Sequence, residues 1–284
     1  MSYRVLPQTL LTLLVLLALT WMPAKAQSGE KDSTTTSLTV GYLNTDFYLA
    51  GEPSSTPFDF SGAMRSLMIS GMHGQLALAY GTRTAGVDVS QPSFRMVDAF
   101  AMTGGNAYLL RGLAGLPVSA YIPIRININY RYLSIDQTEG ESSTDDGLGV
   151  SRVVDDEATA TQHLGTAGLG AGLGARVRIP TQFPIIGNNL VVRGSLVIVP
   201  GGYADLKQNF ETVYMSRTRD LNFEVKLEQL LGGNVGVTLG YTRRTLNRTP
   251  TQPESFSQAL DTVLGEGELL TVSQQNVIRV GINW

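Results

Sequence analysis

The sequence contains no cysteine and only two histidines among its 284 residues. Without cysteine, neither a disulfide framework nor a thiolate zinc site can form. The formal net charge of -3 lacks the basic excess that nucleic-acid-binding surfaces show, so nucleic acid is not expected as a partner. After the N-terminal region, no segment approaches the roughly 20 consecutive apolar residues that a transmembrane helix needs. Any crossing of a membrane would therefore be made by strands.

The first 26 residues have the layout of a secretory signal peptide. Arg4 supplies the positive charge, residues 10–19 form a short apolar stretch, and Ala24-Lys25-Ala26 is a small-residue cleavage site. An uncleaved anchor is the alternative, although the apolar stretch is too short for a spanning helix. We expect a signal peptide at 1–26, a polar leader at 27–36 and one domain at 37–284. The mature chain is then either an exported soluble protein or a membrane barrel.

Residues 118–132, VSAYIPIRININYRY, alternate strictly between apolar and polar side chains. Ile124, Ile126 and Ile128 share one parity, while Arg125 and Arg131 share the other. A strand separates two such sets because successive side chains point to opposite faces. Soluble strands average about 5 to 6 residues, whereas a tilted strand that crosses a bilayer needs roughly 9 to 11. This segment therefore fits a strand with lipid outside and polar groups inside.

The same alternation recurs along the chain. Further strands are predicted at 37–49, 60–70, 75–84, 94–110, 164–179, 190–199, 221–231, 235–244 and 272–284. In the first of them the parity is ambiguous, since Leu38, Val40 and Tyr42 favour one face and Leu43 and Phe47 the other. The ten predicted strands place both ends of the barrel on the same side.

The predicted connections differ in length between the two ends of the strands. On the side of the termini they are short, at 71–74, 111–117, 180–189 and 231–234. On the other side they are mostly longer, at 50–59, 85–93, 134–163, 200–220 and 245–271. Short periplasmic turns and long extracellular loops are typical of outer-membrane barrels. We predict an all-β, closed, antiparallel up-and-down barrel; a soluble β-sandwich is the alternative.

The last predicted strand places Asn276, Ile278, Val280 and Ile282 on one face and ends on Trp284. This ending resembles the C-terminal signal of bacterial outer-membrane β-barrel proteins, which in that family is read by the barrel assembly machinery. The resemblance implies an outer-membrane protein of a Gram-negative-type bacterium, with outer-membrane lipids and that machinery as partners. We expect a monomer without a cofactor.

Residues 164–179 alternate glycine with apolar residues. A glycine-rich phosphate loop is an alternative interpretation, but no strand-to-helix transition or nucleotide-binding lysine follows. Glycine in a strand often marks the close passage of another group. We expect these glycines to face inward and make room for Arg125 and Arg131.

Charged residues of the polar faces should meet in the lumen. The predicted network contains Arg125, Arg131, Arg176, Arg178, Arg193, Glu224, Lys226 and Glu228. Counted from the turns, Arg176, Arg193 and Glu228 should lie at a similar level. Confined charges are costly unless they are paired, so a salt-bridged structural plug is the first interpretation. A narrow pore whose arginines favour anions is the second.

Aromatic residues near the strand ends suggest girdles at the membrane interfaces. We assign Tyr80, Tyr130, Tyr132, Phe223 and Tyr241 to the loop-side girdle, with Trp284 at the opposite side. Arg243, Arg244 and Arg248 should lie just beyond the membrane, where they either contact lipid phosphates or are solvated.

The loop between the fifth and sixth predicted strands is strongly acidic. Its carboxylates Asp145, Asp146, Asp155, Asp156 and Glu157 could bind calcium through oxygen ligands, although the segment does not fit an EF-hand. Acidic runs are more often simply solvated.

No catalytic residue is assigned. The ten-stranded omptin proteases are similar in barrel size, but their Asp-x-His motif is absent, since the histidines are His73 in a turn and His163 at a strand end. A surface hydrolase built from His163, a loop serine and an acid remains a further alternative.

Overall fold

The computed structural model describes eleven segments and two single positions of the chain. They are 36–47, 58–59, 64–71, 74–83, 93–113, 116–136, 159–181, 189–205, 213–230, 234–251 and 269–284, with the isolated positions 258 and 261. The predicted signal peptide, the leader as far as residue 35 and the acidic residues 145–157 lie outside the described residues. No helix within the described part of the chain is long and apolar enough to cross a membrane.

The described residues are almost entirely strands. In chain order they are β1 (Ser37–Phe47), β2 (Phe58–Asp59), β3 (Met64–Ser70), β4 (Gly74–Arg83), β5 (Ser93–Leu113), β6 (Leu116–Asp136), β7 (Thr159–Pro180), β8 (Asn189–Asp205), β9 (Val213–Glu228), β10 (Gly236–Arg248) and β11 (Leu270–Asn283). β2 is a two-residue bridge that pairs with the end of β1. The other ten strands form the barrel.

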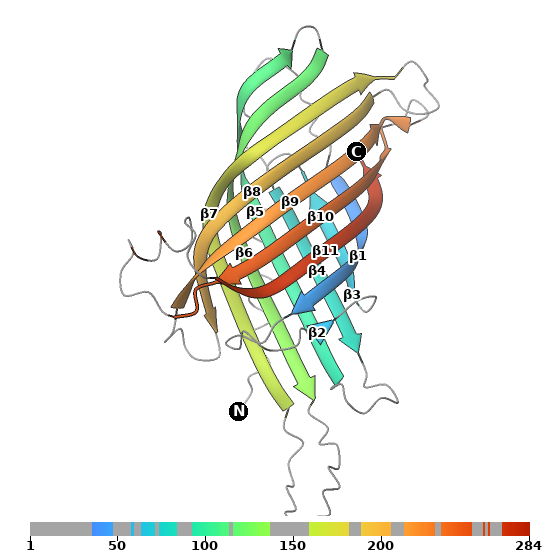
Figure 1. Ribbon diagram of the computed structural model, residues 1–284. Coiled ribbons are helices and arrows are strands. Elements are labelled where there is room, and N and C mark those ends of the chain that lie inside the picture. Colours follow the sequence, from blue (N-terminus) through green and yellow to red (C-terminus); the bar gives the residue numbers. More distant parts are fainter. Residues whose placement is uncertain are drawn as a thin grey trace, which may run out of the picture.

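Each barrel strand pairs antiparallel with its neighbours in the chain, and the sheet closes where β11 pairs with β1 (Figure 1). Ser37 lies opposite Asn283 at this seam. Two backbone hydrogen bonds between Thr36 and Trp284, at 3.0 and 3.1 Å, extend the pairing to the last residue. The predicted closed, up-and-down, ten-stranded antiparallel barrel is confirmed.

The alternation of side chains sorts apolar residues outward and polar residues inward. Outward-facing Ile124 and Leu173 are 48% and 68% exposed, and exposed Leu, Ile and Val side chains occur around the barrel. Arg125 and Arg131, on the other face of β6, are 4% and 2% exposed. In β1, Val40 and Tyr42 face outward, which resolves the ambiguous parity. A soluble β-sandwich would bury the apolar set, so that alternative is excluded.

Several strands are longer than predicted. We expected residues 200–220 to form a loop, but β8 continues to Asp205 and β9 begins at Val213. Only residues 206–212 therefore lie between the two strands. This loop-side connection is shorter than the turn-side connection 181–188, so the predicted pattern of short turns and longer loops fails at this hairpin. The cause is that residues 200–205 and 213–220 continue the β ladder despite Pro200, Gly201 and Gly202.

The inward glycines of β7 lie close to neighbouring groups. A Cβ atom added to Gly170 or Gly172 would overlap backbone atoms of β8, and one added to Gly174 would overlap the ring of Tyr121. The glycines therefore allow β8 and Tyr121 to approach β7 closely. Of the two arginines that we expected beside these glycines, Arg125 lies opposite Gly170, whereas Arg131 lies opposite Leu164.

The turn-side rim of the barrel has a step between β4 and β5. β4 begins at Gly74, which lies opposite Thr103, whereas β5 continues ten residues further to Leu113, paired only with β6. The β5–β6 hairpin therefore rises above β4 (Figure 1). Tyr108 and Tyr121 lie on this raised part and line the interior there.

Candidate functional site

The loop-side end of the lumen is filled by apolar side chains. This apolar layer consists of Leu43, Met64, Ala79, Met96, Leu133, Leu164, Tyr203, Leu246 and Val272, all buried. Met64, Met96 and Leu133 are at most 1% exposed. The residues come from the loop-side halves of nine of the ten barrel strands; the exception is β9, whose Tyr214 packs against the layer. The sequence interpretation, which expected only polar groups inside, missed this layer.

Asp98 on β5 is the acceptor of a hydrogen-bonded cluster beneath the apolar layer. Arg131 donates to Asp98 Oδ2 through Nε at 3.2 Å and through Nη2 at 2.7 Å. Asn129 donates to Oδ1 at 2.6 Å, and Gln275 donates to Oδ2 at 2.5 Å. Because Gln275 lies on β11, this carboxylate links strands that are not neighbours in the sheet. Asp98 is 4% exposed.

Arg244 and Asp220 form a second buried pair. Arg244 Nε donates to Asp220 Oδ1 at 2.8 Å, and its guanidinium lies 3.3 Å from the centroid of the Phe100 ring. Arg248 is 3% exposed and stacks on Tyr214. The expectation that Arg244 and Arg248 lie beyond the membrane is wrong, because both have the inward parity of β10. Of the three arginines, only Arg243 faces outward.

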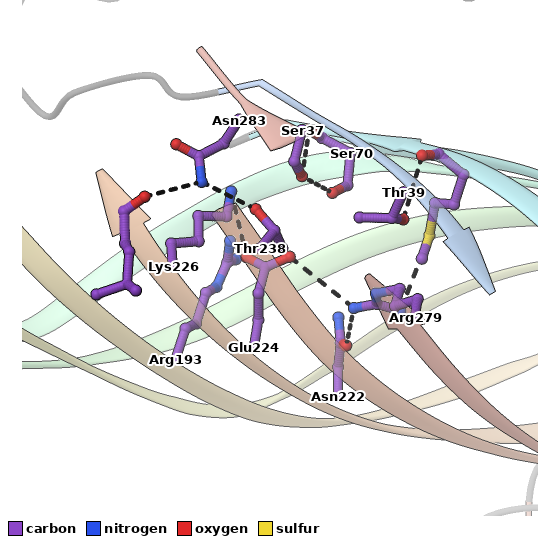
Figure 2. Close-up of polar contacts among 12 residues, drawn as sticks. Ser37, Thr39, Ser70, Arg193, Asn222, Glu224, Lys226, Thr238, Arg279 and Asn283 are labelled. Carbon is purple, nitrogen blue, oxygen red and sulfur yellow. Dashed lines mark hydrogen bonds and ion pairs between the residues drawn. The ribbon is translucent and has the colours of Figure 1, made fainter. Parts of the chain in front are cut away.

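Among the described residues, Arg279 is the largest fully buried side chain, and it joins β11 to β9 and β10 (Figure 2). It donates through Nη2 to Asn222 Oδ1 at 2.7 Å and through Nη1 to Thr242 Oγ1. Glu224 lies 3.9 Å from it and 3.3 Å from Lys226 Nζ. The contacts therefore form one polar network across three strands.

The remaining predicted lumen residues lie in the turn-side half. Arg178 pairs with Glu228 at 3.1 Å. Arg176 lies opposite Arg193, and Arg193 lies opposite Glu224. Glu224 rather than Glu228 therefore shares the level of the two arginines, because β9 ends at Glu228, earlier than expected.

The predicted girdle residues do not all share one height. Tyr80, Tyr130 and Tyr132 lie within six residues of the loop-side ends of β4 and β6. Phe223 and Tyr241 lie opposite each other in the turn-side halves of β9 and β10, so their assignment to the loop-side girdle is wrong. The extension of β9 back to Val213 explains the difference. Trp284 is 52% exposed at the turn-side end.

His163 contacts the tyrosines of β6 on the outer face. Its Nδ1 lies 2.9 Å from Tyr130 Oη, and its ring lies 5.1 Å from that of Tyr132 in an edge-on arrangement. These contacts are those of an additional girdle residue. Among the described residues, no group of three or more His, Cys, Asp or Glu side chains is placed to hold a metal ion. His73 and the acidic loop lie outside them.

Sequence reasoning missed Asp98, Asp220, Arg244 and Arg279 as members of the network. Asp98 and Arg279 have the inward parity of strands that were predicted correctly, so the alternation itself could have identified them. Asp220 was assigned to a loop because β9 was predicted to begin at 221. Their shared signal is a charged residue on the polar parity of a long strand.

The fold and the interior together define a class. A closed antiparallel barrel whose apolar side chains face outward and whose charged side chains face inward is the architecture of an outer-membrane β-barrel. Such closure leaves no unsatisfied sheet edge within a bilayer.

The chain is similar to the translocator domain of autotransporter NalP from Neisseria meningitidis, at 9% sequence identity over 99% of this chain and 96% of that one, with a TM-score of 0.31. At this level of similarity nothing follows about the function of this chain. No protein-family model and no curated protein matches it.

Proposed function

We propose that this protein is an integral barrel of a bacterial outer membrane whose lumen is closed to solute flow. Its role would be structural or in surface interactions, carried by the loop-side connections. The outer-membrane location is supported by the barrel fold, the predicted signal peptide and the C-terminal strand. Outer-membrane lipids and the barrel assembly machinery are the proposed partners, and the proposed state is a monomer.

The observation that carries the closed lumen is the apolar layer above the charged network. Barrels of about eight strands are just filled by side chains, and only much larger ones leave an aqueous channel. Here Met64, Met96 and Leu133 converge from three strands at no more than 1% exposure. Beneath them, Asp98 and Arg131 are paired in the interior. A hydrated ion would have to displace both levels in order to pass.

The lumen also supports a second candidate function. Among the described inward-facing residues, arginines and lysines outnumber carboxylates, which suits a narrow porin-like channel for small anionic solutes. We propose no catalytic role, and a hydrolase centred on His163 would need to release this ring from Tyr130.

Conductance across a planar bilayer tests the proposal. The purified barrel should remain silent at moderate voltage, because the buried side chains of the apolar layer would block a water column through the lumen. Discrete, reproducible conductance steps with anion selectivity would overturn the closed-lumen proposal and support the channel. A matched preparation with Leu133→Ala tests whether the layer controls any conductance that is seen.

A further inference from the structure

The turn-side half of the lumen contains a chamber that the proposed structural role does not use. This chamber, here termed the vestibule, consists of three cavities that all have Gly71 and Arg193 in their lining. The raised β5–β6 hairpin contributes Asn106, Tyr108 and Tyr121 to its wall. The apolar layer lies at the opposite end of the lumen, so a ligand would enter from the turn side.

The vestibule carries more positive than negative charge. Its described cations are Arg125, Arg176, Arg193 and Lys226, whereas its carboxylates are Asp220, Glu224 and Glu228. Each carboxylate already has a cation at salt-bridge distance, since Arg244 contacts Asp220, Lys226 contacts Glu224 and Arg178 contacts Glu228. Charges in a confined interior are costly without a counter-charge. The excess of positive over negative charge in the vestibule therefore favours a bound anion.

Arg125 is a buried cation that is held by neutral groups. It is 4% exposed and donates to Gly105 O at 2.5 Å, to Ile124 O at 2.9 Å and to Asn106 Oδ1 at 2.6 Å. These oxygens satisfy hydrogen-bond donors but bring no formal charge. Arg125 lines the same cavity as Arg193. The two guanidinium groups therefore place two positive charges around one space.

Arg193 is held by Tyr121 and lines all three cavities. Its Nε donates to Tyr121 Oη at 2.8 Å, and the guanidinium lies 5.4 Å from the centroid of that ring. Within the described residues, no hydrogen bond from its terminal Nη atoms to a protein group is found. Gln75, Ser195 and Asn222 line the cavity beside it and can also donate hydrogen bonds; the carboxylate of Glu224, already paired with Lys226, lies in the same lining.

We propose that the vestibule binds a small oxyanion such as phosphate, with Arg193 as the principal contact and Arg125 as the supporting charge. The planar guanidinium fork matches two oxygens of one anion, and such bidentate bonds are stronger than bonds between neutral groups. Ser195, Gln75 and Asn222 would bind the remaining oxygens. A spherical anion such as chloride cannot use this arrangement equally well.

The test is calorimetric titration of the purified full-length mature barrel, in a neutral detergent, with inorganic phosphate and with sulfate against chloride at equal ionic strength. Phosphate should bind at least tenfold more tightly than chloride. Arg193→Gln and Arg125→Gln should each weaken phosphate binding at least tenfold, whereas the outward-facing control Arg243→Gln should leave it unchanged. Far-UV circular dichroism checks that each variant retains the barrel.

Ser195→Asp provides a second test that leaves both arginines in place. The added carboxylate should abolish phosphate binding by repulsion and by neutralising the site. Phosphate binding no stronger than chloride binding, or wild-type affinity in folded Arg193→Gln or Ser195→Asp, would overturn the proposal. The outcome does not depend on the conductance experiment, because a closed barrel and a conducting barrel can each have an anion site at one end.

Discussion

Removal of the Asp98 carboxylate should destabilise the barrel strongly. In Asp98→Ala, Arg131 loses its carboxylate partner, and the amides of Asn129 and Gln275 lose their acceptor. Asp98 and Arg131 are only 4% and 2% exposed, so water cannot readily replace the lost contacts. Breaking a buried ion pair by removing one partner typically costs about 3–5 kcal/mol. We expect a loss of this size in the free energy of unfolding.

The double variant Asp98→Ala/Arg131→Met separates the lost pair from the penalty of an uncompensated charge. Replacement of a buried pair by apolar groups is often neutral or stabilising, whereas one isolated charge is not tolerated. The double variant should therefore be more stable than Asp98→Ala alone, by at least about 1–2 kcal/mol. Thr82→Ala, at an exposed position of β4, is the control and should change stability by less than about 0.5 kcal/mol.

Equilibrium unfolding in urea, with the barrel inserted in lipid vesicles, measures these differences. Trp284 is exposed on the outer face at the turn-side end, so its fluorescence reports insertion and release. Folding and unfolding titrations must coincide for the free energies to be valid. A loss below about 1 kcal/mol in Asp98→Ala would refute the reasoning that the lumen is a dry ion-pair network. A double variant no more stable than the single one would refute it as well.

Three further predictions use the same measurement. Gly172→Ala should lower the free energy of unfolding by about 1–3 kcal/mol, because the new Cβ overlaps the β8 backbone. The control is Gly194→Ala, since the nearest atom to a Cβ added there is 4.0 Å away. Equal effects of the two substitutions would contradict the close approach of β7 and β8. Leu173→Arg should lower the free energy of unfolding in a bilayer by about 2–4 kcal/mol, whereas Leu173→Phe should lower it little. An equally small effect of the arginine would show that this face of the barrel does not contact lipid. Leu133→Ala should lower the free energy of unfolding by about 2–5 kcal/mol, because truncating a side chain that is only 1% exposed leaves a cavity. A loss below about 1 kcal/mol would mean that the apolar layer is hydrated.

The sequence predicts the barrel because a membrane strand carries two separate requirements on its two faces. In β6 and β7 lipid selects apolar residues on one parity, and the lumen selects charged or small residues on the other. Ile124 and Leu173 could therefore be placed outside, and Arg125 and Arg131 inside, from alternation alone. Proline and glycine misled the assignment at Pro200, because glycines near a strand end were taken as a loop although the ladder continues past them.

The contacts within the lumen could not be predicted to the same extent. Alternation assigns a face but not a height, and the height depends on the stagger between neighbouring strands. A strand start misplaced by eight residues in β9 thus moved Phe223 to the wrong girdle and hid Asp220. The apolar layer was also missed, since Met96 and Leu133 have the parity of the polar set. Only the three-dimensional structure shows that such residues from separate strands meet.

The seam between β1 and β11 has a consequence for how this molecule matures. Partners such as Ser37 and Asn283 are separated by nearly the whole chain, so ring closure cannot precede synthesis of the final strand. Contacts of such large sequence separation form slowly. Until they form, the first and last strands would present open edges that invite aggregation. The polypeptide should therefore need protection by chaperones during its passage between export and insertion.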